Sequence, residues 1–340
     1  MGRPAFHLLE ELCFREPNSF LPWYVCCRHA RCWPSFSFPI FPFKLACSKM
    51  IGKVFTALRW AASHPMRRGS KTNAVISFVR SQIGAKLVQG DVCVAFPNDT
   101  RLLVPPQMKG SFHFIWPGVY DFEEMSFVMH FLRPGDLFVD AGANIGVYTV
   151  LASGVAGAQT IAFEPDPLIF DFLQKNVLLN NLSTLACARN LALGDQEKKI
   201  RFTTGLGTEN HVVPRDSIEK NVEVEISSLD KQMTGLEPVV VKIDVEGFER
   251  EVLVGGMNCL TKPSMRALII ERVGNGQDEA ALHKNIRGLG FLPCTYAPLT
   301  RTLHSIPDES FGNIIYVRSL QAANERLSQA PAYRFAGKII

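Results

Sequence analysis

Apolar residues recur along most of the chain in short blocks that alternate with helical patterns. Near-continuous apolar runs such as "DLFVDAG", "QTIAFEP", "PVVVKIDVEG" and "RALIIERV" are separated by stretches with helical spacing, such as "PDPLIFDFLQKNVLLNN". Runs rich in Val, Ile and Leu that alternate with helices are typical of a parallel sheet covered on both faces. The pattern therefore predicts an α/β fold, and ligands of such sheets bind at the carboxyl ends of the strands.

The first part of the chain departs from this pattern. Residues 1–49 are rich in Phe, Pro, Trp and Cys, and their prolines interrupt every helical or strand period. We predict a poorly structured extension, and the amphipathic stretch that opens at Met50 suggests that translation starts there; a native tail that packs on the domain is the alternative. The remaining predicted units are an accessory helical and β segment, a main domain and a C-terminal tail, over residues 50–110, 111–320 and 321–340.

Composition excludes some classes of protein. The 340 residues are 47% hydrophobic and 20% charged, and the formal net charge of +4 is too balanced to indicate nucleic-acid binding. The nine cysteines include no C-x-x-C pair, which argues against a zinc site. No apolar stretch approaches the roughly 20 residues of a membrane span, and acidic residues near the N-terminus argue against a signal peptide. We therefore expect a cytoplasmic protein with neither a membrane span nor a nucleic-acid partner.

The stretch "LFVDAGANIGVYTV" joins a predicted strand to a predicted helix through a charged turn. Asp140 ends the strand, and Gly142 and Gly146 flank the turn. A dinucleotide fingerprint would place its second glycine at Asn144, and an acid at position 140 would repel a pyrophosphate. An acid there instead suits a cationic or hydroxylated ligand.

Glu164 ends the next predicted strand, where a carboxylate can accept both ribose hydroxyls of an adenosine. Ribose without pyrophosphate, in a site that favours positive charge, describes S-adenosyl-L-methionine. We therefore predict that this cofactor is bound by Asp140, Gly142, Asn144, Gly146, Glu164 and Asp195. Asp195 follows the third predicted strand, where it could hydrogen-bond the adenine amino group. An aspartate that only stabilises a turn is an equally good interpretation. The competing interpretation of Asp140 and Glu164 is that they are strand-end acids capping helices.

A second group of charges lies in "VVVKIDVEGFE". Lys242 interrupts an apolar strand and needs a carboxylate partner, and strand alternation places Lys242, Asp244 and Glu246 on one face. Glu271 ends the following strand. We predict that Asp244, Glu246 and Lys242 are the catalytic residues and that Asp244 or Glu246 contacts the acceptor. His211, in a polar loop, is a weaker candidate base. No spacing requires a metal, so none is predicted; Mg²⁺ held by Asp244, Glu271 and one more oxygen is the alternative.

Several spaced motifs together resemble one family. "GVYDFEEMSF", "PGDLFVDAGANIGVYT", "AFEPDP", "NLALGD", "VVVKIDVEGFEREVLVGG" and "NIIYV" are similar to the FkbM family of S-adenosylmethionine-dependent methyltransferases, from about Gly118 to Val317. The resemblance implies a Rossmann-like class I methyltransferase fold, with a mostly parallel seven-stranded sheet, a reversed final strand and helices on both faces. It also implies O-methylation of a hydroxyl on a sugar or natural product.

Other functions remain open from the sequence. A nicotinamide-dependent oxidoreductase shares the doubly wound sheet, although Asp140 and Asn144 fit it poorly. A methyltransferase acting on nucleic-acid bases would carry a [DN]-P-P-[YF] stretch where this chain has "DVEG". A binding protein that keeps the cofactor pocket without transfer is the non-enzymatic alternative.

Overall fold

The computed structural model describes most of the chain beyond residue 55. The described residues are 56–65, 70–87, 90–105, 108, 110–111, 115–116, 119–204, 211–213, 220–272, 277–307, 312–335 and 338–340. The chain divides into two units, residues 1–53 and 54–340, and every described residue belongs to the second. The predictions for residues 1–49 and for a start at Met50 lie outside the described residues. Within the described part, no helix has the length and apolar character needed to cross a membrane.

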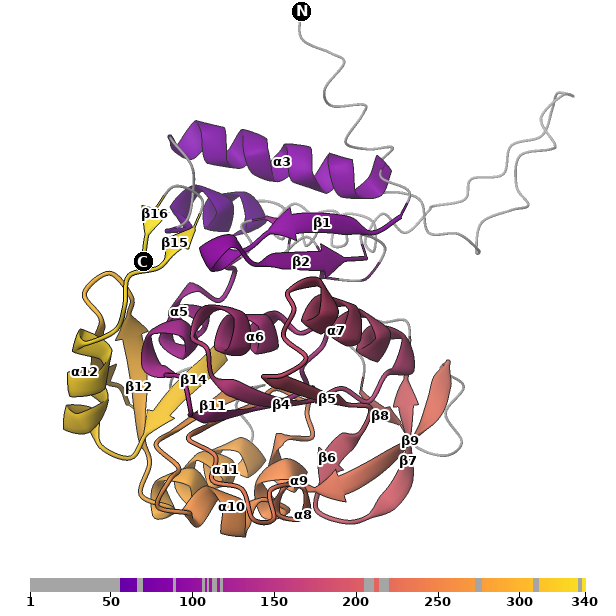
Figure 1. Cartoon of the computed structure of the whole chain (residues 1–340), viewed down its shortest axis with the longest axis vertical. Coiled ribbons are helices and arrows are strands. Elements are labelled where there is room, and N and C mark those ends of the chain that lie inside the picture. Colours follow the sequence, from indigo (N-terminus) through magenta and orange to yellow (C-terminus); the bar gives the residue numbers. More distant parts are fainter. Residues whose placement is uncertain are drawn as a thin grey trace, which may run out of the picture. The chain divides into compact units, whose positions relative to one another are not determined.

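A sheet of eight strands forms the centre of the fold (Figure 1). In spatial order its strands are β13 (Thr302–Ser305), β12 (Leu292–Ala297), β14 (Gly312–Val317), β11 (Ala267–Arg272), β10 (Val240–Ile243), β3 (Leu137–Ala141), β4 (Gln159–Phe163) and β5 (Ala186–Arg189). The strands from β11 to β5 run parallel, and β14 runs antiparallel to both of its neighbours. The central strands β3 and β10 are buried at every position, as their near-continuous apolar sequences predict. The predicted α/β class and the reversed final strand are confirmed.

The expected number of seven strands is wrong, because the chain turns back after β12. Residues 302–305 form the additional edge strand β13, which pairs antiparallel with β12 in the register Cys294↔Ser305. The stretch "LACARNLAL", read as one strand, is also divided into β5 and β6 (Ala192–Gly194), which belong to different sheets. Asn190 lies between them, and its side-chain amide donates hydrogen bonds to the carbonyls of Glu164 and Pro165. This anchor holds the chain at the end of β4 and redirects it.

The second sheet has four strands and its own small core. They are, in spatial order, β6, β9 (Asn221–Ser228), β7 (Lys198–Thr203) and β8 (Val212–Val213). The expected β pair formed by "KKIRFTT" and "VEVEISSLD" is confirmed as the antiparallel pair of β7 with β9. Alternate residues of these strands, including Phe202, Val224 and Ile226, are buried together.

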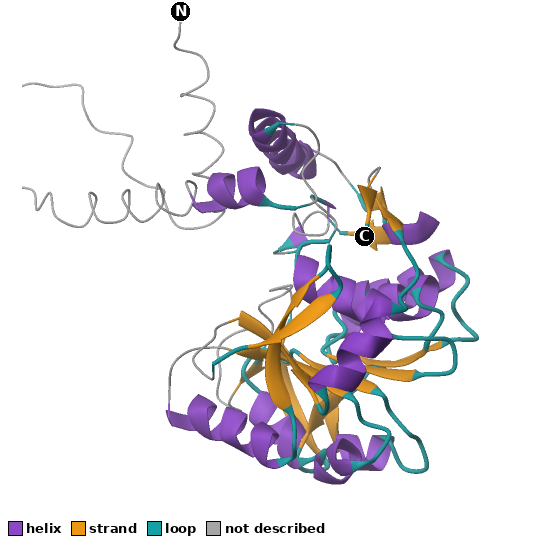
Figure 2. Cartoon of the chain, turned by 90° about the vertical axis from the view of Figure 1, so that its left-hand side faces the viewer, coloured by secondary structure: helices purple, strands orange, loops and turns teal. Residues whose placement is uncertain are grey.

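Helices cover both faces of the large sheet (Figures 1 and 2). One face carries α5 (Phe122–Phe131), α6 (Val147–Val150), its π-helical continuation η2 (Leu151–Val155) and α7 (Pro167–Leu179). The other carries α8 (Leu229–Gln232), α9 (Glu249–Val254), α10 (Met257–Thr261) and α11 (Gln277–Gly288). Strand alternation divides the core between them, since Phe138 packs into the first layer while Val139 and Ala141 pack into the second.

Segments before and after the sheet pack onto the first helical layer. The preceding elements are a helix over residues 56–63, α3 (Lys71–Leu87), β1 (Val92–Ala95), η1 (Pro97–Asp99) and β2 (Arg101–Val104). The Asn176 side chain joins β2 to α7, because its Oδ1 accepts from the Leu103 amide at 2.6 Å and its Nδ2 donates to the Leu103 carbonyl at 3.0 Å.

Residues 321–340, expected to be a tail, contain further elements. These are α12 (Leu320–Ser328), β15 (Arg334–Phe335) and β16 (Lys338–Ile339). Leu327, Tyr333, Phe335 and Ile340 are buried in the same core cluster as the residues of the first helical layer. The segment therefore contributes to the packing of the domain.

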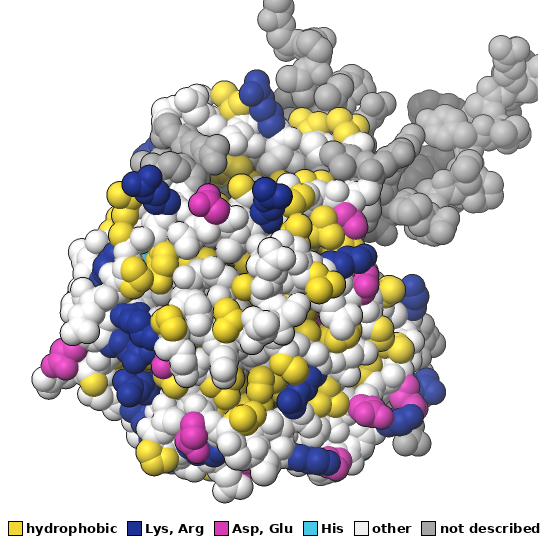
Figure 3. Space-filling view, in the orientation of Figure 1, with side chains coloured by type: hydrophobic (Ala, Val, Ile, Leu, Met, Phe, Trp, Pro, Cys, Tyr) yellow, Lys and Arg dark blue, Asp and Glu magenta, His cyan; other side chains and the backbone are white. Residues whose placement is uncertain are grey.

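Basic and acidic side chains are interspersed on the face shown in Figure 3. The mixture agrees with the nearly balanced totals of 36 Lys and Arg against 32 Asp and Glu. No large field of one sign is visible on the described part of that face.

Candidate active site

The turn after β3 is shaped by its glycines and by Asn144. Gly142 has φ of 76°, and a Cβ atom there would lie 1.8 Å from the carbonyl oxygen of Asp244, so no other residue fits without moving the end of β10. Asn144 also has a left-handed φ of 51°, and its Oδ1 accepts a hydrogen bond from the Ile145 amide at 2.8 Å. The asparagine thus adopts the conformation that glycine provides in a dinucleotide turn, which asparagine tolerates better than most residues.

Glu164 bridges the turn and the start of α7. Its Oε2 accepts from the Asn144 amide and its Oε1 from the Asp166 amide, each at 2.9 Å. Only 6% of the residue is exposed. Burial raises the pKa of Glu164 to about 8, although both amide hydrogen bonds lower it. Each carboxylate oxygen keeps a further lone pair, so the side chain is fixed in place and still able to accept hydrogen bonds from a ligand.

Lys242 is buried between two carboxylates. Its Nζ lies 3.0 Å from Asp244 Oδ2 and 3.9 Å from Asp140 Oδ1. Burial lowers the pKa of Lys242, but the charges of Asp244 and Asp140 outweigh it and raise that pKa. Asp140 is completely buried and also accepts a hydrogen bond from the Thr149 hydroxyl at 2.7 Å. The carboxylate partner expected for Lys242 is present, and it is supplied by two residues.

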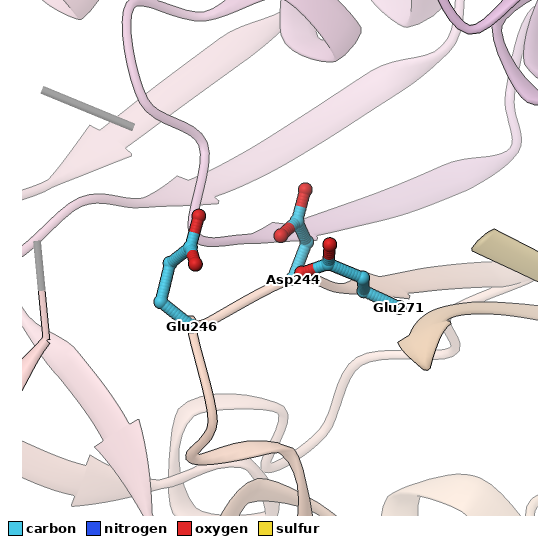
Figure 4. A group of neighbouring side chains, drawn as sticks. All are labelled: Asp244, Glu246 and Glu271. Carbon is cyan, nitrogen blue, oxygen red and sulfur yellow. The ribbon is translucent and has the colours of Figure 1, made fainter. Parts of the chain in front are cut away.

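Asp244, Glu246 and Glu271 form a group of three carboxylates (Figure 4). One oxygen from each lies within 4.8 Å of the others. Burial, followed by the charges of Asp244 and Glu246, raises the pKa of Glu271 to about 8. Such a group can accept hydrogen bonds from several hydroxyls, and oxygen ligands of this kind also suit a hard divalent cation. The metal alternative from the sequence named Asp244 and Glu271 with one more oxygen ligand, and Glu246 lies close enough to supply that oxygen.

These side chains surround one cavity of about 330 Å³. The predicted site residues that line it are Gly142, Asn144, Glu164, Lys242, Asp244 and Glu246, together with Glu271. Parallel strands end at the same edge of a sheet, which explains why residues far apart in sequence meet there.

The other predicted residues lie away from the cavity surface. Asp140 lies beneath it, in contact with Lys242 and Thr149. Gly146 lies at the start of α6, where a Cβ atom would be 2.7 Å from Leu173 Cδ1. Asp195 follows β6 of the second sheet, whereas we had expected it to follow the third strand of the main sheet. Neither Asp195 nor His211 is among the described residues that line the cavity.

Asp121 was missed as a site residue. It lines the cavity, and its Oδ2 is 3.3 Å from both the Tyr148 hydroxyl and the Asn313 Nδ2. Burial, and then the charge of Asp244, raises the pKa of Asp121 to about 7. All three residues lie in motifs that carried the family resemblance, "GVYDFEEMSF", "GVYT" and "NIIYV". The signal was therefore present without an indication of role.

Comparison with protein-family models matches residues 140–293 to the methyltransferase FkbM domain. Among curated proteins, "Methyltransferase 1" of Beauveria bassiana is 31% identical over 148 residues, which cover 36% of this chain and 59% of that protein. The hexuronic acid methyltransferase AglP of Haloferax volcanii is 31% identical over 139 residues, which cover 40% of this chain and 55% of that protein. The matches thus span little more than half of each relative. The family resemblance of this part of the chain is confirmed.

Among solved structures, precorrin-6y C5,15-methyltransferase from Geobacter metallireducens is 11% identical. The match covers 58% of this chain and 87% of that one, with a TM-score of 0.35.

Proposed function

We propose that this chain, whose residues 140–293 match the methyltransferase FkbM domain, is an S-adenosyl-L-methionine-dependent methyltransferase that acts on a hydroxyl of a saccharide or natural product. One observation carries the proposal. Glu164 lies at the carboxyl end of β4, held by the Asn144 amide, and faces a cavity whose charged residues are mostly acidic. A fixed carboxylate suits a ribose, and an acidic cavity suits a cationic sulfonium and ammonium.

The cavity residues fit this cofactor in two further ways. Apolar residues of the lining, among them Phe163, Leu191 and Phe202, offer contacts for a nucleobase. The cofactor would supply a methyl group on positively charged sulfur. Gly142 lines the cavity without a side chain, so a ligand can approach the backbone of the turn closely. Asp195 as a partner of the adenine amino group stays a prediction.

The transfer itself needs alignment and a proton acceptor. The residues of this chain would orient the acceptor hydroxyl toward the methyl group that the cofactor would supply, and a carboxylate would accept the hydroxyl proton. We assign contact with the acceptor hydroxyl to Asp244 and Glu246. Lys242 positions Asp244 through the 3.0 Å ion pair.

The hexuronic acid methyltransferase among the relatives supports a saccharide as acceptor. Residues that select the acceptor are a separate question, because a shared fold does not determine a substrate.

Calorimetric titration with S-adenosylhomocysteine, NAD⁺ and NADP⁺ tests the cofactor. We expect S-adenosylhomocysteine alone to bind, and Glu164→Ala to abolish that binding. Glu223→Ala is the matched control, because 60% of the Glu223 side chain is exposed and it pairs with Lys199 at the surface. Binding of a nicotinamide cofactor alone would overturn the proposal and make the Gly142 turn a phosphate site.

A further inference from the structure

Asp121 begins a helix without capping it. The residue occupies the N-cap position of α5, where an aspartate normally accepts a hydrogen bond from a backbone amide of the first turn. The Asp121 side chain makes no such hydrogen bond. Its half-buried carboxylate lines the cavity instead, so helix capping does not explain an aspartate at this position.

Two neutral donors hold the Asp121 carboxylate from different elements. The Tyr148 hydroxyl of α6 and the Asn313 Nδ2 of β14 both donate to the same oxygen, Oδ2, at 3.3 Å. Tyr148 is itself fixed, because it is buried and the Nζ of Lys242 lies 4.9 Å from the centroid of its ring. Among the described residues no hydrogen bond reaches Oδ1 of Asp121, so that oxygen is left for a ligand.

The hydrogen bond to Asn313 places Asp121 on the β14 side of the cavity. Asn313 is opposite Glu271 in the register of β14 with β11. From β14 the sheet continues through β11, β10 and β3 to β4, and Glu164 directly follows β4. Four strand spacings of about 4.8 Å separate β14 from β4 by roughly 19 Å. A ribose bound at Glu164 would therefore occupy the opposite side of the cavity and leave Asp121 to the acceptor.

Asp121 and Asp244 differ in what holds them. Asp244 is ion-paired with Lys242 at 3.0 Å, so a proton transferred to Asp244 would break that pair and leave the buried ammonium with Asp140 alone, at 3.9 Å. A proton on Oδ1 of Asp121 would break no ion pair, because a hydroxyl and an amide can still donate to Oδ2. Burial, and then the charge of Asp244, raises the pKa of Asp121 to about 7, where a general base is most effective near neutral pH.

We propose that Asp121 takes the proton from the acceptor hydroxyl, with Tyr148 and Asn313 as its positioning residues. The inference rests on the proposed function and adds to it a catalytic residue that precedes residues 140–293, which match the family. The hydroxyl proton passes to Oδ1 of Asp121, the electron pair of the O–H bond stays on the acceptor oxygen, and Asp121 later returns the proton to solvent. Asp244 and Glu246 keep the role of orienting the hydroxyl.

The titratable groups around Asp121 determine how it responds to a cation. They come from its own segment and from the neighbouring elements, and they are Tyr120, Glu124, Lys242, Asp244, Tyr148 and Glu271. Burial and the charge of Asp244 raise the pKa of Asp121, whereas the charge of Lys242 and the Tyr148 hydrogen bond lower it. Burial raises the pKa of Tyr148, so its hydroxyl stays a donor while Asp121 titrates. A positively charged sulfonium in the cavity would lower the pKa of Asp121 further.

Isothermal titration calorimetry measures this response without an acceptor. S-adenosyl-L-methionine is the cationic probe and S-adenosylhomocysteine the probe with neutral sulfur, and titrations in buffers of different ionisation enthalpy give the protons that each releases on binding. If the cation lowers the pKa of Asp121 from about 7 to about 6, the cationic probe should release about 0.5 proton more at the midpoint of these values. This excess should be lost in Asp121→Asn, whose amide oxygen can still accept from Tyr148 and Asn313. Protons that the ligand itself releases are common to the wild type and the variant.

Two further variants identify the titrating group. Glu124→Gln is the matched control, because burial raises the pKa of Glu124 to about 8 while this residue of α5 lies outside the described lining of the cavity. It should keep the wild-type excess. Tyr148→Phe removes a hydrogen bond that lowers the pKa of Asp121, so the excess should be largest at a higher pH than in the wild type. Binding of S-adenosylhomocysteine shows that a variant is folded, and Tyr148→Phe keeps the test valid if Asp121→Asn does not fold.

Turnover tests the proton transfer itself. Glycerol, inositol and methyl glucoside are the hydroxyl probes, and formation of S-adenosylhomocysteine is the readout. The wild-type kcat should rise with pH to a plateau above about 7. Asp121→Asn should lower kcat about 100-fold, remove this pH dependence and leave KM for S-adenosyl-L-methionine within about twofold. If the wild type methylates none of the probes, the calorimetric difference decides.

The outcomes separate the two proposals. Failure of both cofactor probes to bind the wild type contradicts the proposed function. If they bind, the assignment of Asp121 is overturned when Asp121→Asn releases as many protons as the wild type or keeps its kcat and pH dependence. It is also overturned when Tyr148→Phe leaves the pH of largest excess unchanged, or when Glu124→Gln loses the excess as Asp121→Asn does.

Discussion

Replacement of Lys242 by methionine tests whether the buried charge network stabilises the fold. Lys242 has 3% of its side chain exposed, and its ammonium is within 3.9 Å of Asp140, which is completely buried. Methionine matches the volume of lysine but leaves the Asp140 carboxylate with hydrogen bonds from Thr149 and without the positive charge of Lys242. Removing one partner of a buried ion pair typically costs about 3–5 kcal/mol.

The size and pH dependence of this loss follow from the same contacts. For a domain of this size, about 3–5 kcal/mol lowers Tm by roughly 6–20 °C. Burial raises the pKa of Asp140 while Lys242 opposes that rise, so the pKa rises further in the variant. A carboxyl with a raised folded-state pKa stabilises the fold below its unfolded pKa and loses that contribution as pH rises. The loss in Lys242→Met should therefore be smaller at pH 5 than at pH 8.

Thermal unfolding, monitored by circular dichroism at pH 5 and pH 8, measures both the loss of stability and its pH dependence. Lys175→Met is the matched control, because Lys175 pairs with Asp171 at the surface with 44% of its side chain exposed, and its loss should leave Tm almost unchanged. Adding Asp140→Asn to Lys242→Met should recover part of the stability, since the uncompensated charge is removed. A Tm for Lys242→Met within 2 °C or so of the wild type at pH 8 would refute the reasoning.

Three further predictions concern the site. Gly142→Ala should lower the free energy of unfolding, measured in urea, by more than about 3 kcal/mol and should abolish S-adenosylhomocysteine binding. Gly235→Ala is the control, because Gly235 has a similar φ of 72° but no atom within 4 Å of an added Cβ, and it should cost only about 1–2 kcal/mol. Equal losses in the two variants would contradict the steric argument. Because the pKa of Glu164 is raised to about 8, its contribution to stability is full below the ordinary pKa of 4.5 and disappears as pH rises through 8. Glu164→Gln should therefore reduce the fall in unfolding free energy between pH 5 and pH 8. Parallel pH profiles of unfolding free energy for the variant and the wild type would count against this. Asp244→Asn should lower methyl transfer at least about 100-fold and leave S-adenosylhomocysteine affinity within about twofold, and normal turnover would show that the catalytic assignment is wrong.

The positions of the charged strand ends could be predicted from the sequence. Asp140, Glu164 and Asp244 each terminate or directly follow an apolar run, and parallel strands bring such ends to one edge. Glycines with an acid before them indicated a turn close to a ligand, and Gly142 has the positive φ of 76° that this requires. These features depend on local pattern, which is why they can be recognised without coordinates.

The precise environment of each charge could not be predicted in the same way. Asp140 and Glu164 were treated alike, yet Asp140 lies beneath the cavity with Lys242 while Glu164 lines it. The edge strand β13 was missed because a hairpin strand of four residues carries little periodic signal. Whether an acid points inward or toward a ligand depends on what packs beside it, and this information is distributed over several elements.

The sequence by itself determined the α/β class, the strand ends and the resemblance of residues 140–293 to the FkbM domain, because each rests on residues adjacent in the chain. Only the tertiary structure decided which distant residues complete the site. Trp60, Asp121 and Asn313 come from a helix, a helix start and the reversed strand β14, and they meet through packing between elements. Side-chain proximity across such elements is set by sheet order and core packing, which no short stretch of sequence encodes.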